Sequence, residues 1–209
     1  MLHQETVTVP TLDLIRKLQK DPVFDRFCLV GGTALSLQIG HRKSIDIDYF
    51  TRISFDNQPL IEHLEKQYGF SLQYTNLNTV KGFVDGILID LLKHDYPYIN
   101  EPILMDGIKM LSKQDIAAFK VNAITGSGTR AKDFVDIYFL LKEFSFAEIV
   151  GFYSLKYGQR NEFHAVKSLT YFDDLDHSDW PNLVLEKNLT IKKVKESIIL
   201  QRNKFLREV

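Results

Sequence analysis

The chain has 209 residues, 44% of them hydrophobic, which is enough apolar material for one large domain or two small ones. Its formal net charge of −1 excludes a protein that binds nucleic acid through an overall basic field. Cys28 is the only cysteine, which excludes an internal disulfide, and no uninterrupted apolar stretch is long enough to span a bilayer. We therefore expect a cytoplasmic protein without membrane contacts.

The first half of the sequence alternates short predicted strands and helices. Apolar residues at helical spacing predict a helix capped by Thr11, and "RFCLVGG" predicts a strand that ends in a turn at Gly31 and Gly32. A short helix, "TALSLQIG", is expected to stop at Gly40. The next segment, "SIDIDYF", alternates acidic and bulky apolar residues, which is the two-residue period of a strand.

Two Asp-Gly pairs mark predicted hairpins farther along the chain. The amphipathic segment "NQPLIEHLEKQYG" predicts a helix ended by Gly69. The strands "TVKGFV" and "GILIDLLKH" are joined through Asp85-Gly86, and Asp106-Gly107 indicates a second, smaller hairpin.

After Met110 the predicted elements are all helical. We therefore predict an α+β fold, with a mixed sheet flanked by helices in residues 1–110, followed by a helical domain in residues 111–209.

The segment "SIDIDYF" places two carboxylates on one face of its predicted strand. Asp46 and Asp48 are two residues apart, so their side chains should project in the same direction. Two such charges repel unless a cation lies between them, and Mg²⁺ prefers oxygen ligands of this kind. An isolated pair of this kind more often marks a solvated strand face.

The surrounding residues favour a metal site over a solvated face. Gly31 and Gly32 precede a helix whose free N-terminal amides could hold phosphate groups, with Thr33 at its start. Asp90 lies inside the apolar strand "GILIDLLKH", where an unbound carboxylate is costly. We therefore predict that Asp46, Asp48 and Asp90 bind metal beside a phosphate-binding turn.

The order of these motifs resembles the AbiEii/AbiGii toxin-like family of the polymerase-beta-type nucleotidyltransferase superfamily. The first signature is "GGTALSLQIGHRKSIDIDYF", followed by the lone Asp90. The second combines Lys120, in "DIAAFKVNAI", with Arg130, Asp133 and Asp136 in "RAKDFVD". The resemblance covers residues 28 to about 142 and implies a nucleotidyltransferase fold in which the helical domain completes the active-site cleft.

The second signature also has a structural interpretation. Lys120 lies on the apolar stripe of its helix, and Asp136 lies in a run that is apolar on all sides, so each needs a partner. The two could pair across packed helices, or Asp136 could pair with Lys132 on its own helix. His41, Arg42 and Lys43 could form either a positive rim that reaches a triphosphate or a solvated turn.

The resemblance implies transfer of a nucleoside monophosphate (NMP) from a nucleoside triphosphate (NTP) to an acceptor, with release of pyrophosphate. Asp46, Asp48 and Asp90 would hold two Mg²⁺ ions, with Mn²⁺ as an alternative. The implied phosphate-binding residues are Gly31, Gly32, Thr33, Arg42, Lys120 and Arg130, and Asp136 would belong to the catalytic group.

The acceptor implied by the resemblance is RNA, specifically a tRNA 3′ end, and the implied role is the toxin-like partner of an antitoxin protein. Two alternatives remain open on the sequence. One is transfer to a small molecule or a protein, and the other is a catalytically silent module that binds nucleotide or a protein partner.

Overall fold

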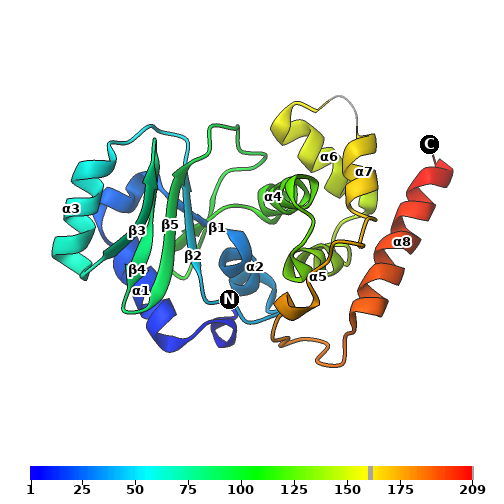
Figure 1. Ribbon diagram of the computed structural model, residues 1–209, viewed down its shortest axis with the longest axis horizontal. Helices are drawn as coiled ribbons and strands as arrows, with labels where there is room; N and C mark the ends of the chain where they lie inside the picture. The colour runs from blue at the N-terminus through cyan, green and yellow to red at the C-terminus, as the bar shows by residue number, and fades with distance from the viewer. Residues whose placement is uncertain (160–161, 209) are drawn as a thin grey trace. The chain divides into compact units, whose positions relative to one another are not determined.

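The computed structural model describes residues 1–159 and 162–208, which form two compact units (Figure 1). Unit 1 comprises residues 1–39, 44–97 and 101–111, and unit 2 comprises residues 40–43, 98–100 and 112–209. Two short segments of the first half of the sequence, 40–43 and 98–100, therefore fold with the helical second half. No helix in the described part of the chain is long and apolar enough to cross a membrane.

Unit 1 is built around a mixed sheet of seven strands in the order β3-β4-β5-β2-β1-β7-β6. The pairs β2/β5 and β1/β7 are parallel, and the remaining neighbours are antiparallel. The strands are β1 (Cys28–Val30), β2 (Ile47–Thr51), β3 (Ser71–Asn76), β4 (Thr79–Val84), β5 (Ile87–Lys93), β6 (Ile103–Met105) and β7 (Ile108–Met110). The predicted mixed sheet flanked by helices is confirmed.

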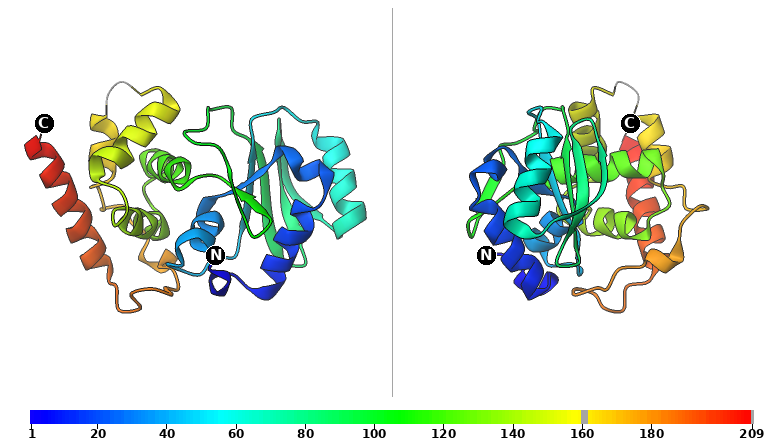
Figure 2. Two further views of the ribbon diagram at one scale, coloured as in Figure 1. Left: turned by 180° about the vertical axis from the view of Figure 1, so that it is seen from behind. Right: turned by 60° about the vertical axis from the view of Figure 1, so that its left-hand side comes forward.

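The helical elements of unit 1 are short 3₁₀ helices and three α-helices. They are η1 (Gln4–Thr6), α1 (Val9–Gln19), η2 (Pro22–Arg26), α2 (Gly31–Ile39) and α3 (Asn57–Tyr68). Helices α1 and α3 lie on the same side of the sheet (Figures 1 and 2). On that side the strands bury apolar side chains such as Tyr49 and Ile89, both fully buried. The opposite side carries Asp48 of β2, Lys81 of β4 and Asp90 of β5, and we call it the acidic face because of the two aspartates.

The two Asp-Gly pairs form the predicted hairpins. Asp85-Gly86 joins β4 to β5, and Asp106-Gly107 joins β6 to β7. In both turns the two residues have positive φ, 50° and 78°, which is the backbone geometry of a two-residue turn that matches the twist of its strands. The Asp-Gly pairs therefore predicted these hairpins correctly because of the backbone conformation that the two residues adopt.

Several predicted boundaries differ from the structure by a few residues. Helix α2 was expected to follow the glycine pair, but it begins at Gly31 itself. Helix α1 begins at Val9, because the side chain of Thr8, rather than that of Thr11, caps it by accepting the Thr11 amide. Strand β2 begins at Ile47, so Asp46 lies just before the strand instead of within it.

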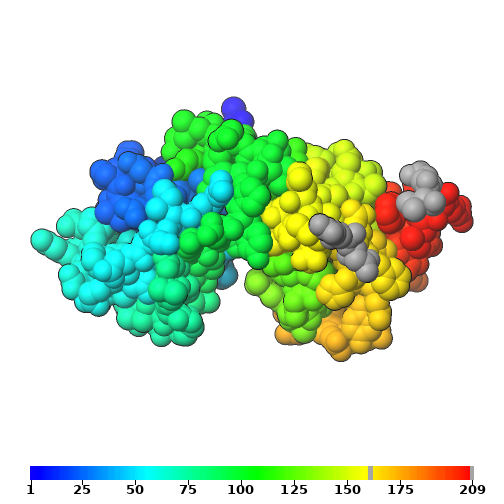
Figure 3. Space-filling view, turned by 90° about the horizontal axis from the view of Figure 1, so that it is seen from above, coloured from blue at the N-terminus to red at the C-terminus, as the bar shows by residue number. Residues whose placement is uncertain are grey.

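Unit 2 contains the helices α4 (Lys113–Gly126), α5 (Ala131–Leu140), α6 (Phe146–Tyr157), α7 (Phe163–Ser168) and α8 (Ile191–Glu208), with the 3₁₀ helix η3 (His177–Asp179). Ser112 caps α4 by accepting the Asp115 amide, and Ser145 with Glu148 forms a capping box at the start of α6. The last helix, α8, packs against α5 and α6. Its surface is drawn in red at one end of Figure 3.

Candidate active site

Asp48 and Asp90 lie side by side on neighbouring parallel strands. In the register of β2 and β5, Asp48 is the direct partner of Asp90. Side chains of paired residues in a sheet project to the same face, and these two project to the face opposite Tyr49 and Ile89. Folding therefore brings together two of the three predicted metal ligands, which are far apart in the sequence.

The third predicted ligand, Asp46, is fixed through its backbone. Thr33, which is buried on α2, donates its hydroxyl to the Asp46 carbonyl, and its Oγ1 lies 2.9 Å from the Ser44 Oγ. These contacts brace the segment that enters β2. Thr33 was predicted to bind phosphate, and the structure places its hydroxyl in this internal brace.

Gly31 is needed because of the position of Asp48. The residue has a φ of +69°, and α2 begins at Gly31 directly after β1. A Cβ atom at Gly31 would overlap the Oδ2 atom of Asp48, so any other residue would displace this carboxylate. The glycine turn and the second aspartate of the Asp-x-Asp motif are therefore packed against each other.

Asp90 is only partly neutralised by its surroundings. Lys81 on β4 is its partner across the antiparallel pair, and the Lys81 Nζ lies 3.7 Å from the Asp90 Oδ2. The other oxygen, Oδ1, is buried and has no hydrogen-bond partner among the described residues. Burial raises the pKa of the Asp90 carboxyl above its ordinary value, and the Lys81 charge opposes this rise.

The carboxylate pair fits a magnesium ion that also binds a substrate. Within residues 1–159 and 162–208, no group of three or more His, Cys, Asp or Glu side chains could hold a metal ion by itself. Mg²⁺, however, is usually bound by one or two carboxylates together with waters and substrate phosphates. Asp48 and Asp90 supply such a partial set of ligands, which includes the Asp90 Oδ1 atom that has no hydrogen-bond partner among the described residues.

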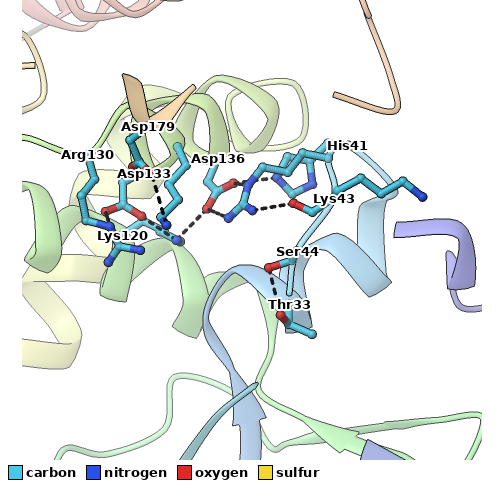
Figure 4. A network of polar contacts seen from close by, with 11 residues as sticks. Thr33, His41, Lys43, Ser44, Lys120, Arg130, Asp133, Asp136 and Asp179 are labelled. Carbon is cyan, nitrogen blue, oxygen red and sulfur yellow. Dashed lines mark hydrogen bonds and ion pairs between the residues drawn. The ribbon is translucent and has the colours of Figure 1, made fainter. Parts of the chain in front are cut away.

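Three residues of the second signature, Lys120, Asp133 and Asp136, belong to a buried ionic network within unit 2 (Figure 4). Lys120 lies between two aspartates, with its Nζ 2.7 Å from the Asp133 Oδ1 and 2.6 Å from the Asp136 Oδ2. Asp136 also accepts two hydrogen bonds from Arg42, of 2.6 and 2.9 Å, and its Oδ1 lies 2.7 Å from the His41 Nε2. Asp136 is therefore the hub of the network.

This network answers the structural alternatives that the sequence left open. Lys120 and Asp136 do pair across α4 and α5, whereas Lys132 pairs with Asp179 at 3.3 Å, so the pairing of Lys132 with Asp136 is wrong. Neither a positive rim nor a solvated turn describes His41 and Arg42, because both side chains are buried.

The predicted phosphate contacts of Arg42, Lys120 and Arg130 stay predictions. Arg42 and Lys120 are bound to aspartates, so either cation would have to exchange a partner in order to reach a phosphate. Arg130 is half exposed and lies 3.8 Å from Asp133. Sequence reasoning missed that His41 and Arg42 are the partners of Asp136, although the lone aspartate in an apolar run was the signal that a partner exists.

Removing the charge of Asp136 should destabilise unit 2 strongly. Burial would raise the pKa of this carboxyl, but Arg42 and Lys120 outweigh burial and hold the pKa well below its usual value. Asp136→Asn removes the carboxylate that pairs with buried Arg42 and one of the two that pair with Lys120, and we expect a loss of about 3–5 kcal/mol in the free energy of unfolding. Urea unfolding monitored by the single tryptophan, Trp180 of unit 2, measures this loss. Exposed Asp174→Asn is the control, and equal stability of the two variants would contradict the assignment.

Protonation of His41 should make the stability of unit 2 depend on pH. Burial lowers the pKa of His41 below 6.5, although Asp136 opposes the shift. Below pH 6.5 the unfolded chain therefore binds a proton that the folded chain excludes, so stability falls as the pH drops from 6.5 towards the folded pKa. We expect His41→Gln to reduce this slope in urea unfolding followed by Trp180 fluorescence. An unchanged slope would contradict the role given to His41.

Comparison with known proteins places the chain among nucleotidyltransferases. A family model described as "Nucleotidyl transferase AbiEii toxin, Type IV TA system" matches residues 13–81. A protein of Aquifex aeolicus named "Uncharacterized protein aq_aa25" is 31% identical over 168 residues, which cover 78% of this chain and 81% of the relative.

Two solved structures from Helicobacter pylori share the fold. One is described as a nucleotidyltransferase, with a TM-score of 0.56 and 16% identity over 97% of this chain and 99% of the other. The second, JHP933, has a TM-score of 0.52 and 16% identity over 97% of this chain and 96% of its own. Because identity is low, these two similarities concern the fold alone. The family match and the relative that extends along most of the chain show that this protein belongs to the AbiEii family of nucleotidyltransferases.

Proposed function

We propose that the chain transfers NMP from an NTP to the 3′ end of an RNA, with Asp46, Asp48 and Asp90 as the metal-binding group. The observation that carries the proposal is the pairing of Asp48 and Asp90 on β2 and β5, with one buried oxygen of Asp90 left unpaired. Two adjacent carboxylates favour a divalent cation, and that cation is the usual partner of a triphosphate.

The start of α2 is suited to bind the triphosphate of the NTP. The helix begins at Gly31, so its first backbone amides have no partners within the helix. Such amides favour anions, and residues 31–33 would hold the β- and γ-phosphates of the NTP. Because Gly31 lies against Asp48, a triphosphate bound there would be next to the carboxylate pair.

The reaction forms one bond and breaks one. The acceptor hydroxyl oxygen attacks the α-phosphorus, the bond from that phosphorus to the bridging oxygen breaks, and pyrophosphate leaves. Asp90 would accept the hydroxyl proton, a role that suits a carboxyl whose pKa is raised by burial. Bound Mg²⁺ would stabilise the charge on the attacking and leaving oxygens.

The acceptor and the biological role rest on the family. The description of the matched family names a toxin of a type IV toxin–antitoxin system, which supports a toxin-like role and a cognate antitoxin protein as partner. For the acceptor, the motif resemblance supports a tRNA 3′ end. Labelled NTP incubated with total tRNA, lysate protein or aminoglycosides separates these acceptor classes, and label in protein or aminoglycoside instead of tRNA would contradict an RNA acceptor.

Asp48→Asn should abolish transfer while leaving the fold intact. The substitution is nearly isosteric but removes a charged ligand, so we expect at least about a hundredfold loss in the transfer of label from an α-³²P-NTP. Asp13→Asn, on the exposed side of α1, is the matched control and should keep the wild-type rate. A thermal melt establishes that both variants are folded. Wild-type transfer by folded Asp48→Asn would refute the proposed site.

A further inference from the structure

Lys81 of β4 is aligned across the sheet with Asp90 of β5 and Asp48 of β2. The register pairs Asp48 with Asp90 and Asp90 with Lys81, so the three side chains project from β2, β5 and β4 to the acidic face. The Lys81 Nζ lies 3.7 Å from the Asp90 Oδ2, which is within ion-pair range but too long for a hydrogen bond. The lysine is therefore held by charge and can move.

The pairing is more than an ordinary surface salt bridge. Asp90 is mostly buried, with a side-chain exposure of 23%, and its Oδ1 atom has no hydrogen-bond partner in the described part of the chain. Lys81 is 36% exposed, so its long side chain can rotate towards solvent. Its ammonium thus offsets part of the charge of Asp90 and leaves the Oδ1 atom of this residue without a hydrogen bond.

A divalent cation and the Lys81 ammonium cannot both stay next to Asp90. They carry charges of the same sign and compete for the same oxygen atoms, so each disfavours the other. Lysine has four flexible side-chain bonds, whereas the aspartates are fixed by the strand register. Binding of the metal ion therefore requires the lysine to move away.

We propose that Lys81 is a resident counter-ion of the carboxylate pair, which neutralises Asp90 before metal binds and is displaced by the divalent cation. This inference rests on the proposed function, because it takes Asp48 and Asp90 to be metal ligands. It makes Lys81 a positioning residue that raises the concentration of divalent cation at which the site fills.

The test measures the binding of Mn²⁺ to the protein without nucleotide. The electron paramagnetic resonance signal of free Mn²⁺ gives the concentration that remains unbound. Lys81→Met keeps an unbranched, flexible side chain one atom shorter and removes its charge, so we expect a Kd for Mn²⁺ about three- to tenfold lower than that of the wild type. Lys81→Arg keeps the charge and should bind Mn²⁺ about as the wild type does.

Lys93→Met is the matched control. Lys93 lies on β5, three residues after Asp90. Because successive side chains of a strand point to opposite faces, Lys93 points away from the acidic face. It pairs with Asp95 at 2.9 Å. This variant changes the net charge by the same amount, and its Kd should stay within about twofold of the wild type. A thermal melt of each variant confirms that it is folded.

The possible results separate this inference from the proposed function. If Lys81→Met binds Mn²⁺ as tightly as the wild type or more weakly, while Asp48→Asn loses binding, the counter-ion role is wrong and the metal site stands. If Lys93→Met tightens binding as much as Lys81→Met, the effect comes from the lower net charge of the protein, and the counter-ion role is again wrong. If neither the wild type nor Lys81→Met binds Mn²⁺, or if Asp48→Asn binds it normally, the proposed metal site itself fails.

Discussion

Asp48 and Asp90 carry like charges on adjacent strands, and this arrangement is unfavourable unless positive charge lies beside it. The rest of unit 1 accommodates this constraint. Gly31 has no side chain where Asp48 needs space, Thr33 braces the segment that enters β2, and Lys81 supplies a partial counter-charge. The fold therefore holds the two carboxylates side by side, and in the function that we propose this pair binds the metal ion.

In unit 2, by contrast, the central buried carboxylate is paired with cations of the protein itself. Asp136 is fully buried, but it is bound on all sides by His41, Arg42 and Lys120, so its charge is compensated within the protein. Such a network orders the residues that contribute to it and is costly to disrupt. It draws residues 40–43, which immediately precede the Asp-x-Asp segment in the sequence, into the helical unit. The motif residues of the second signature thus have a structural role whatever contacts they make with nucleotide.

Much of the fold could be predicted from local patterns, because hairpin turns, helix caps and strand alternation depend on neighbouring residues. Asp85-Gly86 predicted a hairpin correctly since only its own backbone geometry is involved. The start of β2 was predicted too early because alternation of side chains continues through Asp46, whereas the backbone there is fixed by Thr33 of α2. The partners of Asp136 and the alignment of Asp48 with Asp90 depend on contacts between segments far apart in the sequence, which no local pattern encodes. The alignment of Lys81 with Asp90, by contrast, follows from the Asp85-Gly86 turn, because residues paired across a two-residue hairpin are equally far from its turn.

The most direct test of the proposed metal site is a crystal structure of the protein with Mn²⁺ and a non-hydrolysable NTP. We expect an anomalous peak bonded to carboxylate oxygens of both Asp48 and Asp90, with metal–oxygen distances of about 2.0–2.2 Å, and the triphosphate against the start of α2. The ammonium of Lys81 should have moved away from Asp90. A metal–nucleotide complex bound elsewhere, with Lys81 still paired to Asp90, would contradict this site.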